Sequence, residues 1–354
     1  MDVTPKLFLP PSAGETRDTP YAACRDHVTK REARERLEAA WSETRAYMGD
    51  DEAHFLTRFR GRRFHSAAWE LYLRRVLLDV GLPLEKTASA GPDVCTVIDG
   101  RRTWIEATTV EPGEPNLADS VVTRGATERG FSLFPVEQLI LRLTNTLDSK
   151  LEQVRGWIDR DIVQSGDAMV LALNYGTILD ADLHDHEVPA LIQAVFAVGT
   201  PVWIVPVGRG AAHEIETVIP PRHLVAKANG SPVRTDLFLR PESACITGLL
   251  YARQLVWNLR WDARRDLGYV HNPIAKPLPH ESLPVRSQSW SEDGAIRTEA
   301  IAEVSDGEWV PRPLDRPSTS ASAARRAERE RIAAMSPRER ALLSLRLGDG
   351  GAQR

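Results

Sequence analysis

Apolar positions recur along the chain at two spacings, one typical of helices and the other of strands. The clearest helical stretch lies between Ser66, a candidate cap, and Gly81, a candidate stop. Its apolar positions are Trp69, Leu73, Val76, Leu77 and Val80. The Asp99-Gly100 pair inside residues 92–110 is a strong signal for a tight hairpin turn between two strands.

The same spacings predict the remaining elements. Further helices are expected at 24–50, 136–164 and 187–199, and further strands at 84–89, 168–175, 201–208, 236–240, 244–252 and 267–273. Because strands and helices alternate, we predict an α/β fold with a central mixed β-sheet flanked by helices on both faces.

The hydrophobic pattern also predicts how the chain divides. Residues 1–50 are expected to form an N-terminal arm and an outer helix, and residues 51–285 the main domain. The pattern fades after Pro279, so residues 286–324 are expected to be a linker and residues 325–354 an arginine-rich helical tail.

Composition excludes several classes of protein. The 354 residues are 42% hydrophobic and 27% charged, which excludes a globally disordered chain. The net charge of −4 argues against a basic nucleic-acid coat protein. Three widely separated cysteines exclude a disulfide scaffold and a clustered zinc site. With no long apolar run and no signal peptide, we expect a cytoplasmic protein that makes no contact with membranes.

The hairpin predicts that two carboxylates face each other. If Asp99-Gly100 is a two-residue turn, Asp93 lies opposite Glu106, with the two Cβ atoms about 5 Å apart. Such a pair repels unless a cation lies between the two groups, and a divalent metal is one solution. A shared proton, or neutralisation by Arg101 or Arg102, is the alternative.

Glu70 lies at the edge of the apolar stripe of the 66–81 helix, so it is expected to be partly buried and to need a partner. Because this helix precedes the sheet directly, Glu70 is a candidate for the same metal cluster. An ion pair with Arg74, one helical turn further on, is the alternative.

The order of the predicted helices and strands, and the spacing of the acidic residues along them, resemble the PD-(D/E)XK nuclease superfamily, which has the restriction-endonuclease-like fold. The matching residues are Glu70, Gly91-Pro92-Asp93 and Glu106-Ala107-Thr108, and the resemblance covers about residues 60–210. It implies an αβββαβ core within residues 51–285 and hydrolysis of phosphodiester bonds, in DNA more often than in RNA. It also implies Mg²⁺ or Mn²⁺ held by Asp93, Glu106 and the carbonyl of Ala107, with Glu70 holding a second ion or its water.

The chain departs from the family at Thr108, where the resemblance implies a lysine. Lys150, Gln153 and Trp157 share one face of the following helix, and Gln153-x-x-x-Trp157 resembles the Gln-x-x-x-Tyr signature of RecB-like members. In some members a lysine from this helix takes over the missing role. Lys150 is therefore the candidate that stabilises the developing charge, with Gln153 orienting it. Lys86 is the second candidate.

A cationic stretch precedes the candidate site. Residues 58–75 hold six arginines and one acidic residue, a net charge of +5. Such a patch suits contacts to a nucleic-acid backbone, although an ordinary solvated surface has the same composition. The candidate contacts are Arg58, Arg60, Arg62 and Arg63.

Three functions remain open on this basis. The first is a metal-dependent nuclease acting on nucleic acid, with DNA favoured as the partner and a homodimer possible. The second is a restriction-like fold without catalysis that serves as a nucleic-acid-binding or assembly module, which Thr108 favours. The third is a glycosidase that uses the paired carboxylates.

Overall fold

The structure is a computed structural model. It describes residues 5–12, 16, 19–48, 52–88, 90–114, 116–121, 134–178, 181, 188–200, 202–204, 216–278, 285–290, 296–299, 303–305 and 308–310. The chain forms two compact units, Met1–Ile301 and Ala302–Arg354. The site residues all belong to the first unit.

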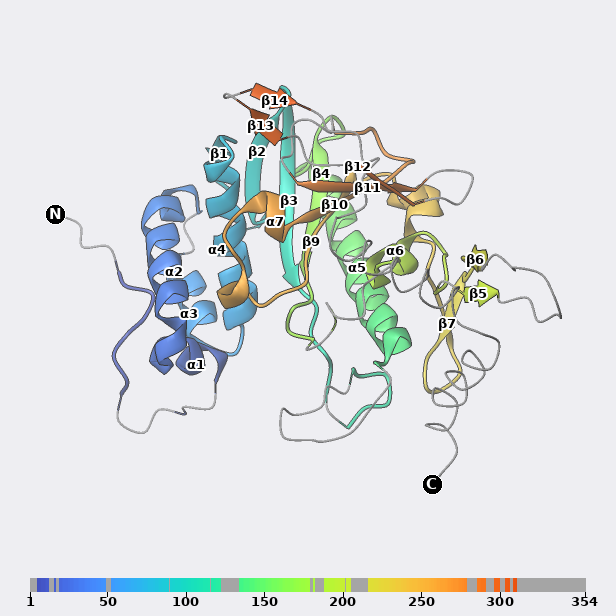
Figure 1. Cartoon of the computed structure of the whole chain (residues 1–354). Helices are drawn as coiled ribbons and strands as arrows, with labels where there is room; N and C mark the ends of the chain where they lie inside the picture. The colour runs from blue at the N-terminus through green and yellow to red at the C-terminus, as the bar shows by residue number, and fades with distance from the viewer. Residues whose placement is uncertain are drawn as a thin grey trace. The chain divides into compact units, whose positions relative to one another are not determined.

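A mixed β-sheet forms the centre of the first unit (Figure 1), as the alternation of elements predicted. Six strands follow the order β1-β2-β3-β4-β9-β10, and β11 and β12 extend this sheet. The bounds are β1 Leu84–Glu85, β2 Val94–Ile98, β3 Arg101–Thr109, β4 Ala168–Asn174, β9 Gly248–Ala252, β10 Gly268–His271, β11 Arg286–Trp290 and β12 Ile296–Glu299. Strand β4 runs parallel to both β3 and β9, whereas β2 runs antiparallel to its two neighbours, β1 and β3.

Helices lie on both sides of this sheet (Figure 1). The helices are α1 Pro20–Asp26, α2 Arg31–Thr44, α3 Glu52–Arg60, α4 Phe64–Asp79, α5 Val136–Asp159, α6 Ala190–Val195 and α7 Ala263–Asp266. Short 3-10 turns span Val28–Lys30, Arg45–Tyr47, Leu237–Leu239, Pro241–Ser243 and Val256–Asn258. Two small hairpins complete the unit, β5 Val202–Ile204 with β6 Glu216–Val218 and β7 Leu224–Ala226 with β8 Pro232–Arg234.

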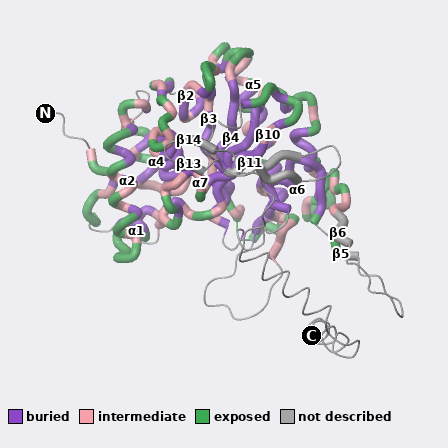
Figure 2. The backbone as a smooth tube through the Cα atoms, turned by 45° about the horizontal axis from the view of Figure 1, so that its top comes forward, coloured by how far each residue is buried: buried purple, intermediate pink, exposed green. Residues whose placement is uncertain are grey.

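Alternation along β4 produces two separate hydrophobic clusters. Every residue of this strand is buried (Figure 2). Ala168, Val170 and Ala172 belong to the cluster that contains α4, and Met169 and Leu171 belong to the cluster that contains α5 and α6. Because successive strand residues point to opposite faces, one continuous apolar run covers both faces of the sheet.

The turn between β2 and β3 has the geometry that its sequence favours. Asp99 and Gly100 both have positive φ, 48° and 73°, as a type I′ hairpin turn requires. Ile98 therefore pairs with Arg101, and the ladder continues to Val94 opposite Ile105. The predicted register is confirmed, and it places Asp93 immediately beyond the last pair, next to Glu106.

The N-terminal segment is part of the main core where it is described. Leu7, which we expected in an arm, is fully buried in the α4 cluster, and its N–H donates to Glu38. The expected helix over 24–50 is broken at His27, whose backbone is extended and whose Nδ1 accepts from the N–H of Thr29. α1 and α2 are therefore separate helices.

Three further sequence expectations need correction. Within the expected strand 236–240, Leu237–Leu239 form a 3-10 turn, because Leu237 and Phe238 bury in the α5–α6 cluster. α4 begins at Phe64, so Ser66 lies inside the helix and is not its cap. Part of the expected linker 286–324 is strand, since it holds β11, β12 and, in the second unit, the hairpin of β13 Glu303–Ser305 with β14 Glu308–Val310. The predicted tail 325–354 lies outside the described residues.

None of the helices within the described part of the chain is both long and apolar enough to cross a lipid bilayer.

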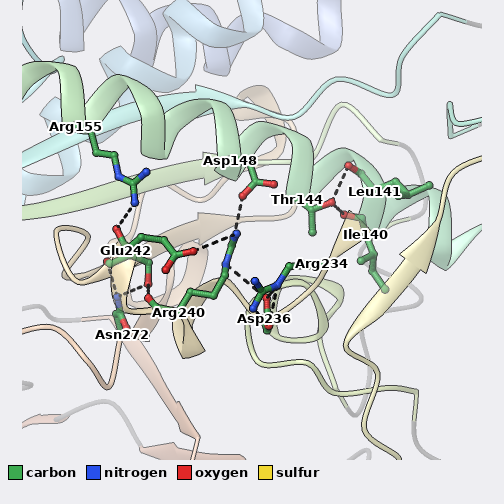
Figure 3. Close-up of polar contacts among 11 residues, drawn as sticks. Ile140, Leu141, Thr144, Asp148, Arg155, Arg234, Asp236, Arg240, Glu242 and Asn272 are labelled. Carbon is green, nitrogen blue, oxygen red and sulfur yellow. Dashed lines mark hydrogen bonds and ion pairs between the residues drawn. The ribbon is translucent and has the colours of Figure 1, made fainter. Parts of the chain in front are cut away.

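A charged network attaches the 3-10 turns at 237–243 to the outer side of α5 (Figure 3). The guanidinium of Arg240 lies 2.9 Å from Asp148 Oδ1 and 3.5 Å from Asp236 Oδ1, with only 13% of its side chain exposed. Asp236 is also paired with Arg234, whose side chain is 57% exposed. Arg155 of α5 donates to the carbonyl of Glu242. Arg240 is thus the most enclosed cation of this network.

Replacing Arg240 with methionine is expected to lower the free energy of unfolding by about 2 kcal/mol, because Asp236 stays buried with one partner fewer. Arg234→Met is the matched control, and its cost is expected to be about 0.5 kcal/mol, since exposed ion pairs contribute little. Urea unfolding of the two variants measures both values. Equal small losses would contradict this account of the network.

Candidate active site

Asp93 is held at the point where β2 begins. Its Oδ2 accepts a hydrogen bond of 2.9 Å from the backbone N–H of Ala107 in β3. The N–H and C=O of one strand residue leave the strand at the same edge, so the carbonyl of Ala107 also faces Asp93. The β2–β3 ladder ends at Val94 and Ile105, so this edge of β3 continues past the last β2 partner.

Glu106 lies on the opposite face of β3 from Ile105 and Ala107, toward α5. Its Oε1 accepts a hydrogen bond of 2.6 Å from Lys150 Nζ, and the carboxylate side chain is only 7% exposed. Lys150 Nζ also donates to Gln153 Oε1 at 2.9 Å. The lysine of this face of α5 thus contacts the carboxylate of Glu106, and the glutamine of the same face contacts the lysine. Lys86, the second candidate, is exposed just after β1.

Glu70 reaches the site from α4, on the other face of the sheet. One carboxylate oxygen lies 2.7 Å from Arg74 Nη1 and the other 2.8 Å from Arg58 Nη2, and the side chain is 4% exposed. The alternative partner, Arg74, is therefore present. The two faces explain why, within the described residues, no three acidic, histidine or cysteine side chains form a group that could hold a metal ion.

Although they do not form one group, Glu70 and Glu106 both lie close enough to affect the ionisation of Asp93. The pKa of the Asp93 carboxyl is raised well above its usual range, chiefly by burial and then by the negative charges of Glu70 and Glu106. The positive charge of Arg74 and the N–H of Ala107 act in the opposite direction. Charged Asp93 is thus disfavoured in the absence of a further cation.

This shift makes stability depend on pH. The folded chain holds the Asp93 proton more tightly than the unfolded chain, so the stabilising contribution is complete below the usual carboxyl pKa of about 4. It is lost as the pH rises through the raised pKa. Asp93→Asn is therefore expected to increase the free energy of unfolding at pH 8 by about 1 kcal/mol, with the difference vanishing near pH 4.

The measurement is urea unfolding of both proteins between pH 4 and pH 8. Asp99→Asn is the matched control, because Asp99 sits in the exposed turn at a positive φ that asparagine tolerates. This control is expected to leave the pH dependence unchanged. A lower stability of Asp93→Asn at pH 8 would contradict the assigned repulsion.

The four candidate nucleic-acid arginines divide into two pairs. Arg58 is engaged with Glu70, and Arg60 donates to the carbonyls of Lys6 and Leu7. Arg62 and Arg63 are exposed at the turn between α3 and α4. The surface part of the predicted patch is therefore Arg62 and Arg63.

Two hydrogen bonds to backbone carbonyls at the site were not predicted from the sequence. Arg74 Nη2 donates a hydrogen bond of 2.6 Å to the backbone carbonyl of Asp93. Trp157 Nε1 donates to the carbonyl of Ala90, which ties α5 to the loop before Asp93. Hydrogen bonds to backbone carbonyls produce no pattern in the sequence, although helical spacing does predict the face of the helix on which Arg74 and Trp157 lie.

Comparison of the chain with protein-family models, with curated proteins and with solved structures gave no match. Functional inference therefore rests on the residues and geometry of this chain.

Proposed function

We propose that the protein is a metal-dependent nuclease with a restriction-endonuclease-like core, which hydrolyses phosphodiester bonds, with DNA favoured over RNA. The observation that carries the proposal is the placement of Asp93 beside Glu106, with Lys150 Nζ 2.6 Å from that glutamate. The element order α4-β1-β2-β3-α5-β4 and the parallel pairing of β3 with β4 support the αβββαβ core.

The donor set fits a hard divalent cation. Asp93, Glu106 and the carbonyl of Ala107 supply oxygen atoms only, which Mg²⁺ and Mn²⁺ prefer. The pKa of Asp93 is raised first by burial and then by the negative charges of Glu70 and Glu106, and a bound cation would offset both effects. When bound, such an ion supplies an activated water and stabilises negative charge on phosphate oxygens.

Lys150 supplies the charge that Thr108 cannot. In the proposed reaction its ammonium lies beside Glu106 and stabilises the charge that develops on the phosphate. Gln153 Oε1 accepts from the same Nζ and so orients it. Arg62 and Arg63, exposed in the turn directly before α4, are the proposed contacts to the nucleic-acid backbone.

A second candidate function is a binding module without catalysis. Its support is that Lys150 already neutralises Glu106, so the repulsion between the two acids is reduced without a metal. In that reading the fold and the exposed arginines serve recognition of nucleic acid only.

One experiment separates the two functions. The full chain is incubated with plasmid, linear duplex DNA, single-stranded DNA and RNA, in Mg²⁺, in Mn²⁺ or in EDTA, and its melting temperature is measured with and without Mn²⁺. The nuclease predicts cleavage that EDTA abolishes, together with a higher melting temperature in Mn²⁺. Neither cleavage nor a thermal shift, with binding of DNA retained, would leave the binding module.

A further inference from the structure

Asp93 lies outside the hydrogen-bond ladder that fixes the rest of the hairpin. The last paired residues are Val94 and Ile105, and the residue before Asp93 is Pro92, which has no N–H to donate. Some other contact must therefore hold the backbone of Asp93 in place. The carbonyl oxygen of Asp93 accepts a short hydrogen bond of 2.6 Å from Arg74 Nη2 of α4 and a longer one of 3.5 Å from Thr87 Oγ1.

Arg74 is itself fixed by Glu70. Their side chains are 3% and 4% exposed, and Arg74 Nη1 lies 2.7 Å from Glu70 Oε1. The second oxygen of Glu70 lies 2.8 Å from Arg58 Nη2, so α3 is joined to the same network. A buried guanidinium with partners on two sides has one orientation available, which is what precise placement of a backbone carbonyl requires.

The alternative is that Glu70 binds an ion directly. Both of its oxygens already lie within ion-pair distance of an arginine. To bind a metal, Glu70 would release at least one of these partners and leave a guanidinium buried without its charge partner, which is costly. The contacts of Glu70 are therefore those of a buried structural residue that holds two arginines in place.

We propose that Glu70 and Arg74 are positioning residues of the active site. Glu70 orients Arg74, and Arg74 holds the backbone of Asp93 so that its carboxylate stays on the N–H of Ala107 beside Glu106. This inference rests on the proposed function, because it assigns to Asp93 and Glu106 the role of holding the cation.

The test measures Mn²⁺ affinity of the full chain by electron paramagnetic resonance of free Mn²⁺, in a double-mutant cycle. Glu70→Gln, Arg74→Met and the double variant are each expected to weaken binding about tenfold, since residues that orient ligands have effects of this size. The double variant is expected to show no further loss, because the two residues act as one unit. Additive losses in the double variant, or a loss for Glu70→Gln alone, would mean that Glu70 is a ligand and would overturn the proposal.

Arg75→Met is the matched control. Arg75 is the next residue of α4, and it pairs with Asp79 and Glu43 on the surface. Its replacement is expected to leave Mn²⁺ affinity unchanged. Circular dichroism monitors folding, and if Arg74→Met does not fold, the double variant replaces it, since removal of both partners of a buried pair is tolerated better than removal of one.

Kinetics give a second readout. Arg74→Met is expected to lower kcat about tenfold with little change in KM for DNA, because Arg74 contacts Asp93 and not the substrate. Arg74→Lys keeps a cation at this position and is expected to have a kcat between those of the wild type and Arg74→Met. If the wild type binds Mn²⁺ and Arg74→Met keeps the same Mn²⁺ affinity and kcat, this inference alone is refuted. If the wild type binds no Mn²⁺, both the proposed function and this inference are refuted.

Discussion

Asp93→Asn is expected to reduce metal-dependent cleavage about a thousandfold. Asparagine keeps the shape of the side chain and can still accept from the N–H of Ala107. It removes the negative charge that attracts the cation, and a bound cation contributes several kcal/mol of transition-state stabilisation. Single-turnover cleavage of the best substrate in Mg²⁺ and in Mn²⁺ measures the loss.

The same variant separates catalysis from folding. Asp93→Asn is expected to be more stable than wild type at pH 8, so a loss of activity cannot be attributed to unfolding. Asp99→Asn makes the same chemical change in the turn of the same hairpin and is expected to keep full activity. Unchanged cleavage by Asp93→Asn would exclude this carboxylate from the reaction.

Lys150→Ala is expected to reduce the rate of cleavage about a hundredfold, because it removes the ammonium that α5 places 2.6 Å from the carboxylate of Glu106. The effect is expected in kcat, since a charge that acts on the transition state contributes little to substrate binding. Binding of DNA by the variant, measured in Ca²⁺, is expected to stay close to wild type.

Arg155→Ala is the control for Lys150→Ala, because it removes a cation from the opposite side of α5, where Arg155 donates to Glu242 (Figure 3). Lys86→Ala tests the second candidate from the sequence. A large loss of cleavage in Lys86→Ala, together with full activity in Lys150→Ala, would show that Lys86, after β1, takes the role of the lysine that Thr108 replaces. Full activity in both variants would contradict a lysine-assisted reaction.

Much of this site was predictable because local chemistry determines it. Asp99-Gly100 specifies a type I′ turn, the turn fixes the register, and the register brings Asp93 next to Glu106. Helical spacing likewise places Lys150 and Gln153 on one face. These steps use only neighbours in sequence or across a hairpin.

Other features were predicted wrongly because distant packing decides them. The apolar pattern predicts a strand at Leu237 and Phe238, but these residues bury beside α6 and form a 3-10 turn. A short apolar run indicates that a segment is buried, but it does not indicate the surface against which the segment packs. The N-terminal pattern predicts an arm at Leu7, whereas its burial depends on α2 and α4, which the segment itself does not reveal.

The α/β alternation, the hairpin register and the residues that carry the charges of the site follow from the amino-acid sequence alone. The groups that those charges contact depend on how the helices pack against the sheet. It placed Glu70 and Glu106 on opposite faces of the sheet, one between two arginines and the other on Lys150. The physical reason is that period and turn type act over a few residues, whereas the partner of a buried charge is whichever group the packing of α3, α4 and α5 brings within reach.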